Sequence, residues 1–208
     1  MIIGLLLLAT ALLLAGRNIL NDSKAGNASD SMVEQMHEAL SGSDLQYYDG
    51  SNSANLADLP DYIRFPDMEL PVGTFDGQEC IGILQLPTLD KEFAVIGDLT
   101  YDNLYYAPCR FYGTPYKNNM VIAAHNFYSH FTYIRNLELG DSVIFIDMAG
   151  NVFNYKVGDT EVLQPYEVEK MIDSQWDLSL FTCTFDSASR FTVRCVNDNT
   201  NASIVDLG

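Results

Sequence analysis

Short apolar or alternating runs, separated by turn residues, follow one another from about Pro71 to the end of the chain. Eight such runs occupy residues 82–86, 93–96, 120–124, 142–146, 152–157, 161–163, 178–182 and 191–196. Runs of this length between turn signals such as Ala149-Gly150-Asn151 are typical of strands. They predict an all-β fold in which eight strands close a barrel. Residues 166–174 are the only segment of this part expected to form a helix.

The chain begins with a nearly unbroken apolar run over residues 1–20. At about 1.5 Å per residue, fifteen to twenty helical residues span about 22–30 Å, close to one hydrocarbon core. No basic region precedes the run and no A-x-A site follows it, so we expect a retained membrane anchor rather than a cleaved signal peptide. Arg17 and Lys24 lie on its C-terminal side, which slightly opposes an outward-facing domain under the positive-inside tendency.

Residues 21–70 are polar and rich in Ser, Asp and Asn. Ser31-Met-Val-Glu34 resembles a capping box, and apolar residues at helical spacing follow it as far as Leu40. We therefore expect a flexible spacer with one short helix. The predicted organisation is an anchor over residues 1–20, a spacer over residues 21–70 and a catalytic barrel over residues 71–208.

Charge and cysteine content exclude several classes of protein. The net charge is −17, with only 11 Lys and Arg residues, which argues against nucleic-acid binding. No two of the four cysteines have the C-x-x-C spacing of a zinc or redox site. Cys80, Cys109 and Cys195 are expected to be small buried side chains.

Cys183 and His125 each follow an apolar run. Cys183 comes directly after the run at residues 178–182, and His125 comes directly after the run at residues 120–124. A histidine beside a cysteine can form an ion pair with the thiolate and can protonate a leaving amine. His130 is the competing histidine, although it lies in a segment expected to be a packed loop.

Two arginines that follow Cys183 are candidates for a cationic residue beside it. Arg190 lies seven residues later, and residues 184–189 can close a hairpin between them. A guanidinium there could stabilise an oxyanion or hold a substrate carbonyl. Arg194 lies four residues further on and is expected on the same strand face. Spacing alone leaves both arginines open.

Five motifs between about Cys80 and Val196 occur in an order that matches a known family. Asn119-Met-Val-Ile-Ala-Ala-His125 matches G-N-x-V-I-A-G-H, and Leu180-Phe-Thr-Cys183 with Arg190-Phe-Thr-Val193 matches T-L-x-T-C and R-x-x-V. The remaining motifs are Ile81-Gly-Ile-Leu-Gln-Leu-Pro87, which matches I-G-x-L-x-I-P, and Phe131 with Leu137-Glu-Leu-Gly-Asp141, which matches F…L…L-x-x-G-D. In this the chain resembles the sortases, the cysteine transpeptidases of Gram-positive cell surfaces. Ala124 replaces a glycine of the pattern, Asn118 replaces another, and Leu178-Ser-Leu-Phe stands where T-L is usual, but every reacting group is present.

The resemblance implies an eight-stranded sortase barrel with an active site formed by Cys183, His125 and Arg190. Cys183 would attack the Thr–Gly bond of an LPxTG-like sorting signal, and His125 would protonate the leaving amine. Arg190 is favoured over Arg194 because R-x-x-V fits Arg190 with Val193. Thr182, Arg194 and Asn126 are expected to contact the substrate.

The same resemblance implies the partners and the location. The acyl acceptor would be an amine of a cell-wall precursor or of a pilin, and the barrel would lie outside the cell on a single-pass anchor. No cofactor and no metal are required, although some sortases bind calcium through acidic loops. The equivalent positions here would be Asp98, Asp102, Glu167 and Glu169.

Two other functions compete with this interpretation. An L,D-transpeptidase also orders His before Cys, but its Ser-His-Gly motif does not match the residues before Cys183. A non-catalytic surface-binding domain could use a similar barrel. Rapid alkylation of the Cys183 thiol that depends on His125 would indicate an enzyme, and a buried inert thiol would indicate the binding domain.

Overall fold

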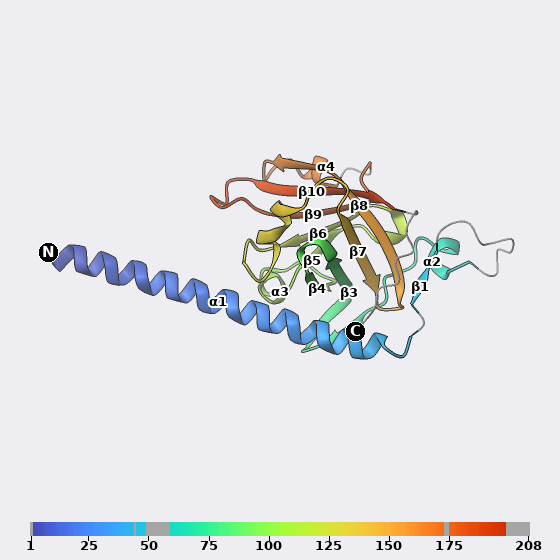
Figure 1. The fold of residues 1–208 in the computed structure, drawn as a ribbon, viewed down its shortest axis with the longest axis horizontal. Coiled ribbons are helices and arrows are strands. Elements are labelled where there is room, and N and C mark those ends of the chain that lie inside the picture. Colours follow the sequence, from blue (N-terminus) through green and yellow to red (C-terminus); the bar gives the residue numbers. More distant parts are fainter. Residues whose placement is uncertain (1, 44, 49–58, 173–174, 199–208) are drawn as a thin grey trace.

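A barrel of strands lies beside one long helix that projects well beyond it (Figure 1). The computed structural model describes residues 2–43, 45–48, 59–172 and 175–198. Within these residues the helices are α1 (Ile2–Leu40), α2 (Asp61–Arg64), α3 (Tyr101–Tyr106) and α4 (Val168–Met171), with 3-10 turns η2 (Pro87–Leu89), η3 (Pro115–Lys117) and η4 (Phe131–Asn136). The strands are β1 (Gln46–Tyr47), β2 (Gly73–Phe75), β3 (Gln78–Leu86), β4 (Lys91–Ile96), β5 (Cys109–Tyr112), β6 (Met120–Ala124), β7 (Ser142–Asp147), β8 (Asn151–Leu163), β9 (Leu178–Cys183) and β10 (Arg190–Asn197).

Strands β3 to β10 form a closed barrel. The order β8-β10-β9-β6-β5-β4-β3 is completed by β7, which pairs with both β3 and β8. The pairs β6–β9 and β4–β5 are parallel, and the other pairs of the barrel are antiparallel. The predicted eight-stranded closed barrel is confirmed, with the short strands β1 and β2 added at β8 and β3.

Two of the eight predicted strands differ from those observed. The runs at residues 152–157 and 161–163 are one strand, β8, because Gly158 is not a turn residue but the extra residue of a bulge opposite the Arg194–Cys195 step of β10. Strand β5 was not predicted. It is four residues long, it is interrupted by a register shift, and the side chains of Phe111 and Tyr112 are exposed, so it lacks a clear apolar pattern.

The interior of the barrel is filled by large apolar side chains. Members with at most 1% of their surface exposed include Leu84, Leu86, Ile122, Phe131, Phe145, Tyr155, Leu180 and Val193. The transfer of such side chains out of water contributes about 1.5–3 kcal/mol each, which makes this core the main source of stability. The segment expected to be helical at residues 166–174 contains the single turn α4.

Helix α1 is longer than the sequence predicts. It runs without a break from Ile2 to Leu40, whereas we expected an anchor and a separate short helix. Its buried residues recur at helical spacing and form one stripe, which comprises Ala25, Ser29, Met32, Val33, Met36 and Leu40. This stripe packs on the outside of the barrel against β3, β4 and α3, and such packing stabilises a helix whose middle is polar.

The first half of α1 has no such packing. Its side chains from Ile3 to Leu20 are almost all exposed, including ten large aliphatic ones. By length and composition this helix is long and apolar enough to cross a membrane, a criterion that an N-terminal signal sequence also meets. Much of the remaining spacer predicted between residues 41 and 60 lies outside the described residues.

Candidate active site

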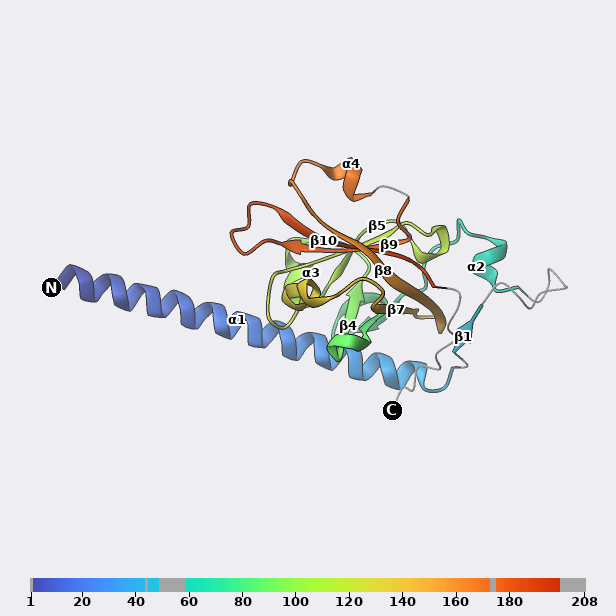
Figure 2. The same ribbon diagram turned by 45° about the horizontal axis from the view of Figure 1, so that its top comes forward.

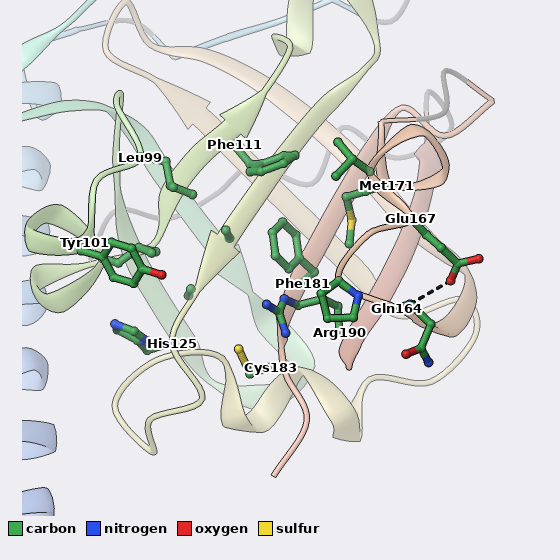
Figure 3. A pocket seen from close by; sticks show the side chains of 15 residues that line it. Leu99, Tyr101, Phe111, His125, Gln164, Glu167, Met171, Phe181, Cys183 and Arg190 are labelled. Atoms are coloured by element: carbon green, nitrogen blue, oxygen red, sulfur yellow. Dashed lines mark hydrogen bonds between the residues drawn. The ribbon is translucent and has the colours of Figure 1, made fainter. Parts of the chain in front are cut away.

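A pocket of about 310 Å³ opens on the outer face of the barrel, where β6 and β9 end (Figure 3). The three residues predicted to react, Cys183, His125 and Arg190, all line it. The rest of the lining is mainly apolar and comprises Leu99, Leu104, Phe111, Ala123, Ala124, Pro165, Val168, Met171 and Phe181, with Tyr101, Gln164 and Glu167 as the polar members. Largely apolar walls with a few polar groups are typical of a ligand site.

Strand pairing brings Cys183 and His125 together. Strands β6 and β9 are parallel neighbours, and Ala124 is the register partner of Thr182. Cys183, the last residue of β9, and His125, the first residue after β6, therefore lie at the same end of two adjacent strands. The Thr182 hydroxyl donates a hydrogen bond of 2.9 Å to the carbonyl oxygen of Ala124, which fixes the two strand ends to each other.

A tight hairpin returns Arg190 to the cysteine, as the spacing predicts. Arg190 is the register partner of Cys183 across β9 and β10. The turn is closed by the amide of Thr184, which donates to the carbonyl of Ser189 at 2.9 Å, and by Ser187 in the left-handed region with φ 58°. The side chains of Arg190 and His125 lie on opposite sides of Cys183 in the pocket (Figure 3).

The three residues expected to contact substrate do not line the pocket. Arg194 is 1% exposed, and its guanidinium donates to Glu161, Ser179 and the carbonyl of Met171. Thr182 is fully buried, and its hydroxyl donates to the Ala124 carbonyl. Asn126 is half-buried and accepts hydrogen bonds from Thr132 and Arg135 through its amide oxygen.

Arg135 is a residue of this site that sequence analysis missed. Its guanidinium donates to the backbone carbonyl of Cys183 at 2.6 Å and to the Asn126 side chain at 3.1 Å. It also stacks over the ring of Phe185, 4.4 Å from the centroid. Arg135 thus joins the segment after His125 to the hairpin after Cys183. Its only signal in the sequence is its place between Phe131 and Leu137 of one family-like motif.

Burial separates Cys183 from the other three cysteines. Cys80, Cys109 and Cys195 have no exposed surface, and burial raises the pKa of the Cys80 and Cys109 thiols to about 12. These thiols stay protonated and unreactive at neutral pH, as predicted for small buried side chains. Cys183 is half-buried, and its side chain reaches the pocket.

Burial also acts on the two histidines of this region. His125 is half-buried and stacks on Phe127 at a centroid distance of 4.8 Å. Desolvation lowers the pKa of His125 below its ordinary value, since a charged imidazolium is penalised away from water. His130 is fully buried, and desolvation, followed by repulsion from His125, lowers the pKa of His130 to about 4.

The buried His130 makes stability depend on pH. Its ordinary pKa of 6.5 applies to the unfolded chain, which therefore binds the extra proton between pH 6.5 and about 4. The free energy of unfolding should fall as pH drops through this window, by about 3 kcal/mol at most. Denaturant unfolding in detergent micelles at pH 7 and pH 4.5 measures the loss. The His130→Phe variant should show a smaller loss than the parent, and an equal loss in both would contradict this origin.

No acidic cluster of the kind that holds a metal is present in the part of the chain that the structure describes. No group of three or more His, Cys, Asp or Glu side chains in that part is close enough to hold a metal ion. Of the four carboxylates considered for calcium, Glu167 is paired with Lys170 and accepts a hydrogen bond from the Gln164 amide.

Comparison with known proteins agrees with this arrangement. A family model described as the sortase domain matches residues 84–198. Solved structures of sortases share the fold. One is a sortase D5 transpeptidase from Clostridium perfringens, which is 16% identical with a TM-score of 0.56; the match covers 85% of this chain and 99% of that chain. Another is sortase A from Corynebacterium diphtheriae, which is 17% identical with a TM-score of 0.54; the match covers 91% of this chain and 97% of that chain. No curated protein matches the chain.

The matched region includes the pocket residues His125, Cys183 and Arg190 and seven strands of the barrel in full, with β3 in part. The family match, the closed eight-stranded barrel and the placement of these side chains agree with one another. The chain belongs to the sortase family.

Proposed function

We propose that this chain is an active transpeptidase in which Cys183, His125 and Arg190 carry the reaction. The observation that supports this most strongly is that these three side chains come from three neighbouring strand ends and line one pocket. A cysteine nucleophile, a histidine acid and a guanidinium are together sufficient for acyl transfer.

The first half of the reaction forms a thioester. The Cys183 thiolate attacks the carbonyl carbon of a Thr–Gly bond, and negative charge develops on the carbonyl oxygen. The C–N bond then breaks, and the leaving amine takes a proton from the His125 imidazolium. The products are an acyl group bound to the Cys183 sulfur, a free amine and a neutral imidazole.

The second half transfers the acyl group. An amine acceptor attacks the thioester carbon, gives its proton to His125 and displaces the Cys183 thiolate. Both catalytic groups return to their starting protonation states, and one amide bond has replaced another. The acceptor we propose is an amine of a peptidoglycan precursor or of a pilin.

The pocket favours a substrate with apolar residues next to the scissile bond. Its walls include Leu99, Phe111, Met171 and Phe181. Phe111 and Phe181 pack edge to face with centroids 5.4 Å apart, which keeps the surface between β5 and β9 rigid and apolar. An LPxTG-like signal would place its leucine and proline against such walls and its threonine carbonyl near Cys183.

The apolar half of α1 would hold the enzyme in the cell membrane as a single-pass anchor, with the barrel outside the cell. The exposed aliphatic side chains from Ile3 to Leu20 would then be covered by lipid. This location places the enzyme beside secreted substrates that carry sorting signals.

A cleavage assay with LPxTG-like peptides tests the proposed reaction. We expect cleavage between Thr and Gly, and ligation when a primary amine is added, with both lost in the Cys183→Ala variant. If Cys183→Ala cleaves as fast as the parent, the nucleophile is wrong. If no peptide is cleaved and the thiol resists alkylation in the folded protein, a non-catalytic binding domain replaces this proposal.

Replacing Arg190 with alanine should lower kcat by about 10²–10³-fold, as removal of an oxyanion donor does in other acyl-transfer enzymes. The reason is that Arg190 is the pocket cation directly opposite Cys183 in the β9–β10 register. The peptide-cleavage assay measures the effect. Arg64→Ala is the control, since Arg64 is exposed and its contacts with Asp61 and the Phe65 ring lie outside the residues that line the pocket. Equal kcat in the Arg190→Ala variant and the parent would remove Arg190 from the mechanism.

A further inference from the structure

The loop that follows the candidate catalytic histidine is attached to helix α1. The Asp22 carboxylate accepts hydrogen bonds from the Ser129 amide at 2.9 Å, the Ser129 hydroxyl at 2.6 Å and the Tyr128 amide at 3.2 Å. Gly26, one turn further along α1, lies so close to this loop that an added Cβ would be 3.0 Å from the Cβ of Ser129. The contact therefore combines hydrogen bonds with a close approach of the helix to the loop.

The position of Asp22 along α1 sets the height of this loop above the apolar segment. Asp22 lies two residues beyond Leu20 on the same unbroken helix, which is an axial rise of about 3 Å. The headgroup layer on each side of a bilayer is about 5–7 Å thick. If residues 2–20 span the hydrocarbon core, Tyr128 and Ser129 lie at the level of the lipid headgroups.

Two exposed aromatic side chains lie at this end of the barrel. Tyr128 has 66% of its surface exposed, and Phe185, at the tip of the β9–β10 hairpin, has 73% exposed. Figures 1 and 2 both show the β9–β10 hairpin on the side of the barrel that faces the N-terminal half of α1. Aromatic residues are enriched at the membrane–water interface, where the ring contacts acyl chains and any hydroxyl stays hydrated.

The active site belongs to the same end. His125 precedes the attached loop, and Cys183 precedes the hairpin that carries Phe185. Arg135 connects the two segments through Cys183, Asn126 and the ring of Phe185. These contacts link the Asp22 site to both segments, so the height of the Asp22 contact should also set the height of the pocket.

We propose that the active-site end of the barrel rests on the lipid surface, with Tyr128 and Phe185 in the headgroup layer and Asp22 as the contact that sets this orientation. The inference depends on the proposed role of α1 as a membrane anchor. The partner is the bilayer that holds α1. The thioester on Cys183 is consequently presented at the membrane surface rather than at the end of a flexible tether.

Depth-dependent fluorescence quenching tests this orientation in the full chain. Trp176 is the only tryptophan, so a Trp176→Phe parent gives a dark background. Four variants of that parent each carry one tryptophan: Tyr128→Trp, Phe185→Trp, Leu13→Trp within the apolar segment and Phe65→Trp after α2. Phe65 is a matched control because it is 56% exposed and follows α2, which lies at the opposite end of the barrel from the first half of α1.

Each variant is placed in nanodiscs of phosphatidylcholine and phosphatidylglycerol with bromine on the acyl chains near the headgroup. We expect a loss of emission in Tyr128→Trp and Phe185→Trp relative to discs without bromine, and none in Phe65→Trp. Adding Asp22→Ala should restore emission in Tyr128→Trp. All four positions are at least half exposed, so the substitutions leave the core intact.

The controls separate this inference from the proposal on which it depends. Quenching in Leu13→Trp without quenching in Tyr128→Trp and Phe185→Trp would overturn the docking while the anchor stands. Absence of quenching in Leu13→Trp would overturn the anchor and the docking together. Peptide cleavage by the same samples reports the proposed reaction independently of either result.

Discussion

The His125→Ala variant should lose about 10²–10⁴-fold in kcat for peptide cleavage, the range typical of a removed general acid–base group. The leaving amine needs a proton, and His125 is the pocket side chain that can supply it beside Cys183. Desolvation lowers the pKa of His125, so the charged acid form becomes scarcer as pH rises above that lowered value. Initial rates of peptide cleavage across pH 5 to 9 measure both effects.

His37→Ala is the matched control for this prediction. His37 lies on α1 and pairs with Glu92 at 2.7 Å, outside the residues that line the pocket. Its removal should leave kcat unchanged. A His125→Ala variant that keeps the parental rate and pH profile would show that another group protonates the amine.

The Arg194→Met variant should lower the free energy of unfolding by about 1–3 kcal/mol, the cost of leaving a buried hydrogen-bond acceptor without its donor. Arg194 is 1% exposed, pairs with Glu161 at 2.7 Å and donates to the Ser179 hydroxyl and to the Met171 carbonyl. Methionine fills the volume of the side chain but leaves these acceptors unpaired. Denaturant unfolding in detergent micelles measures the loss.

Arg190→Met provides the comparison on the same strand. Arg190 is half-buried, and its guanidinium bond within the described residues is to the Ser189 carbonyl at 3.2 Å, so we expect stability close to that of the parent. The two substitutions should therefore have different effects: loss of Arg190 should lower turnover, and loss of Arg194 should lower stability. Equal destabilisation by both substitutions would contradict the structural role of Arg194.

Strand periodicity predicts one property of Arg190 and Arg194 but not the other. The spacing of four predicts that Arg190 and Arg194 share a face, and both do lie outside the barrel, since Val193 and Cys195 point into the core. The segment around α4 covers Arg194, and the Met171 carbonyl accepts a hydrogen bond from the Arg194 guanidinium. That contact joins residues 23 positions apart, and no local pattern in the sequence predicts it.

Helix α1 differs from its prediction for another reason: the local polar pattern predicts a spacer where tertiary contacts stabilise a helix. Polar residues such as Asn21, Asp22 and Ser23 indicate a flexible spacer when they are considered alone. In the structure they continue the helix, because a stripe from Ala25 to Leu40 packs against the barrel and Asp22 binds the loop after His125. The strand ends that carry Cys183 and His125 were predictable because short apolar runs and reactive residues coincide there.

Intact-mass spectrometry of the full chain with a panel of LPxTG-like peptides tests the central claim most directly. We predict a mass increase equal to the acyl fragment up to threonine, located on Cys183, absent from Cys183→Ala and diminished in Arg190→Ala. Release of the adduct on addition of a primary amine, with a ligated product, would complete the proposed cycle. A folded protein that cleaves the peptides but never carries an acyl group on Cys183 would contradict the thioester mechanism.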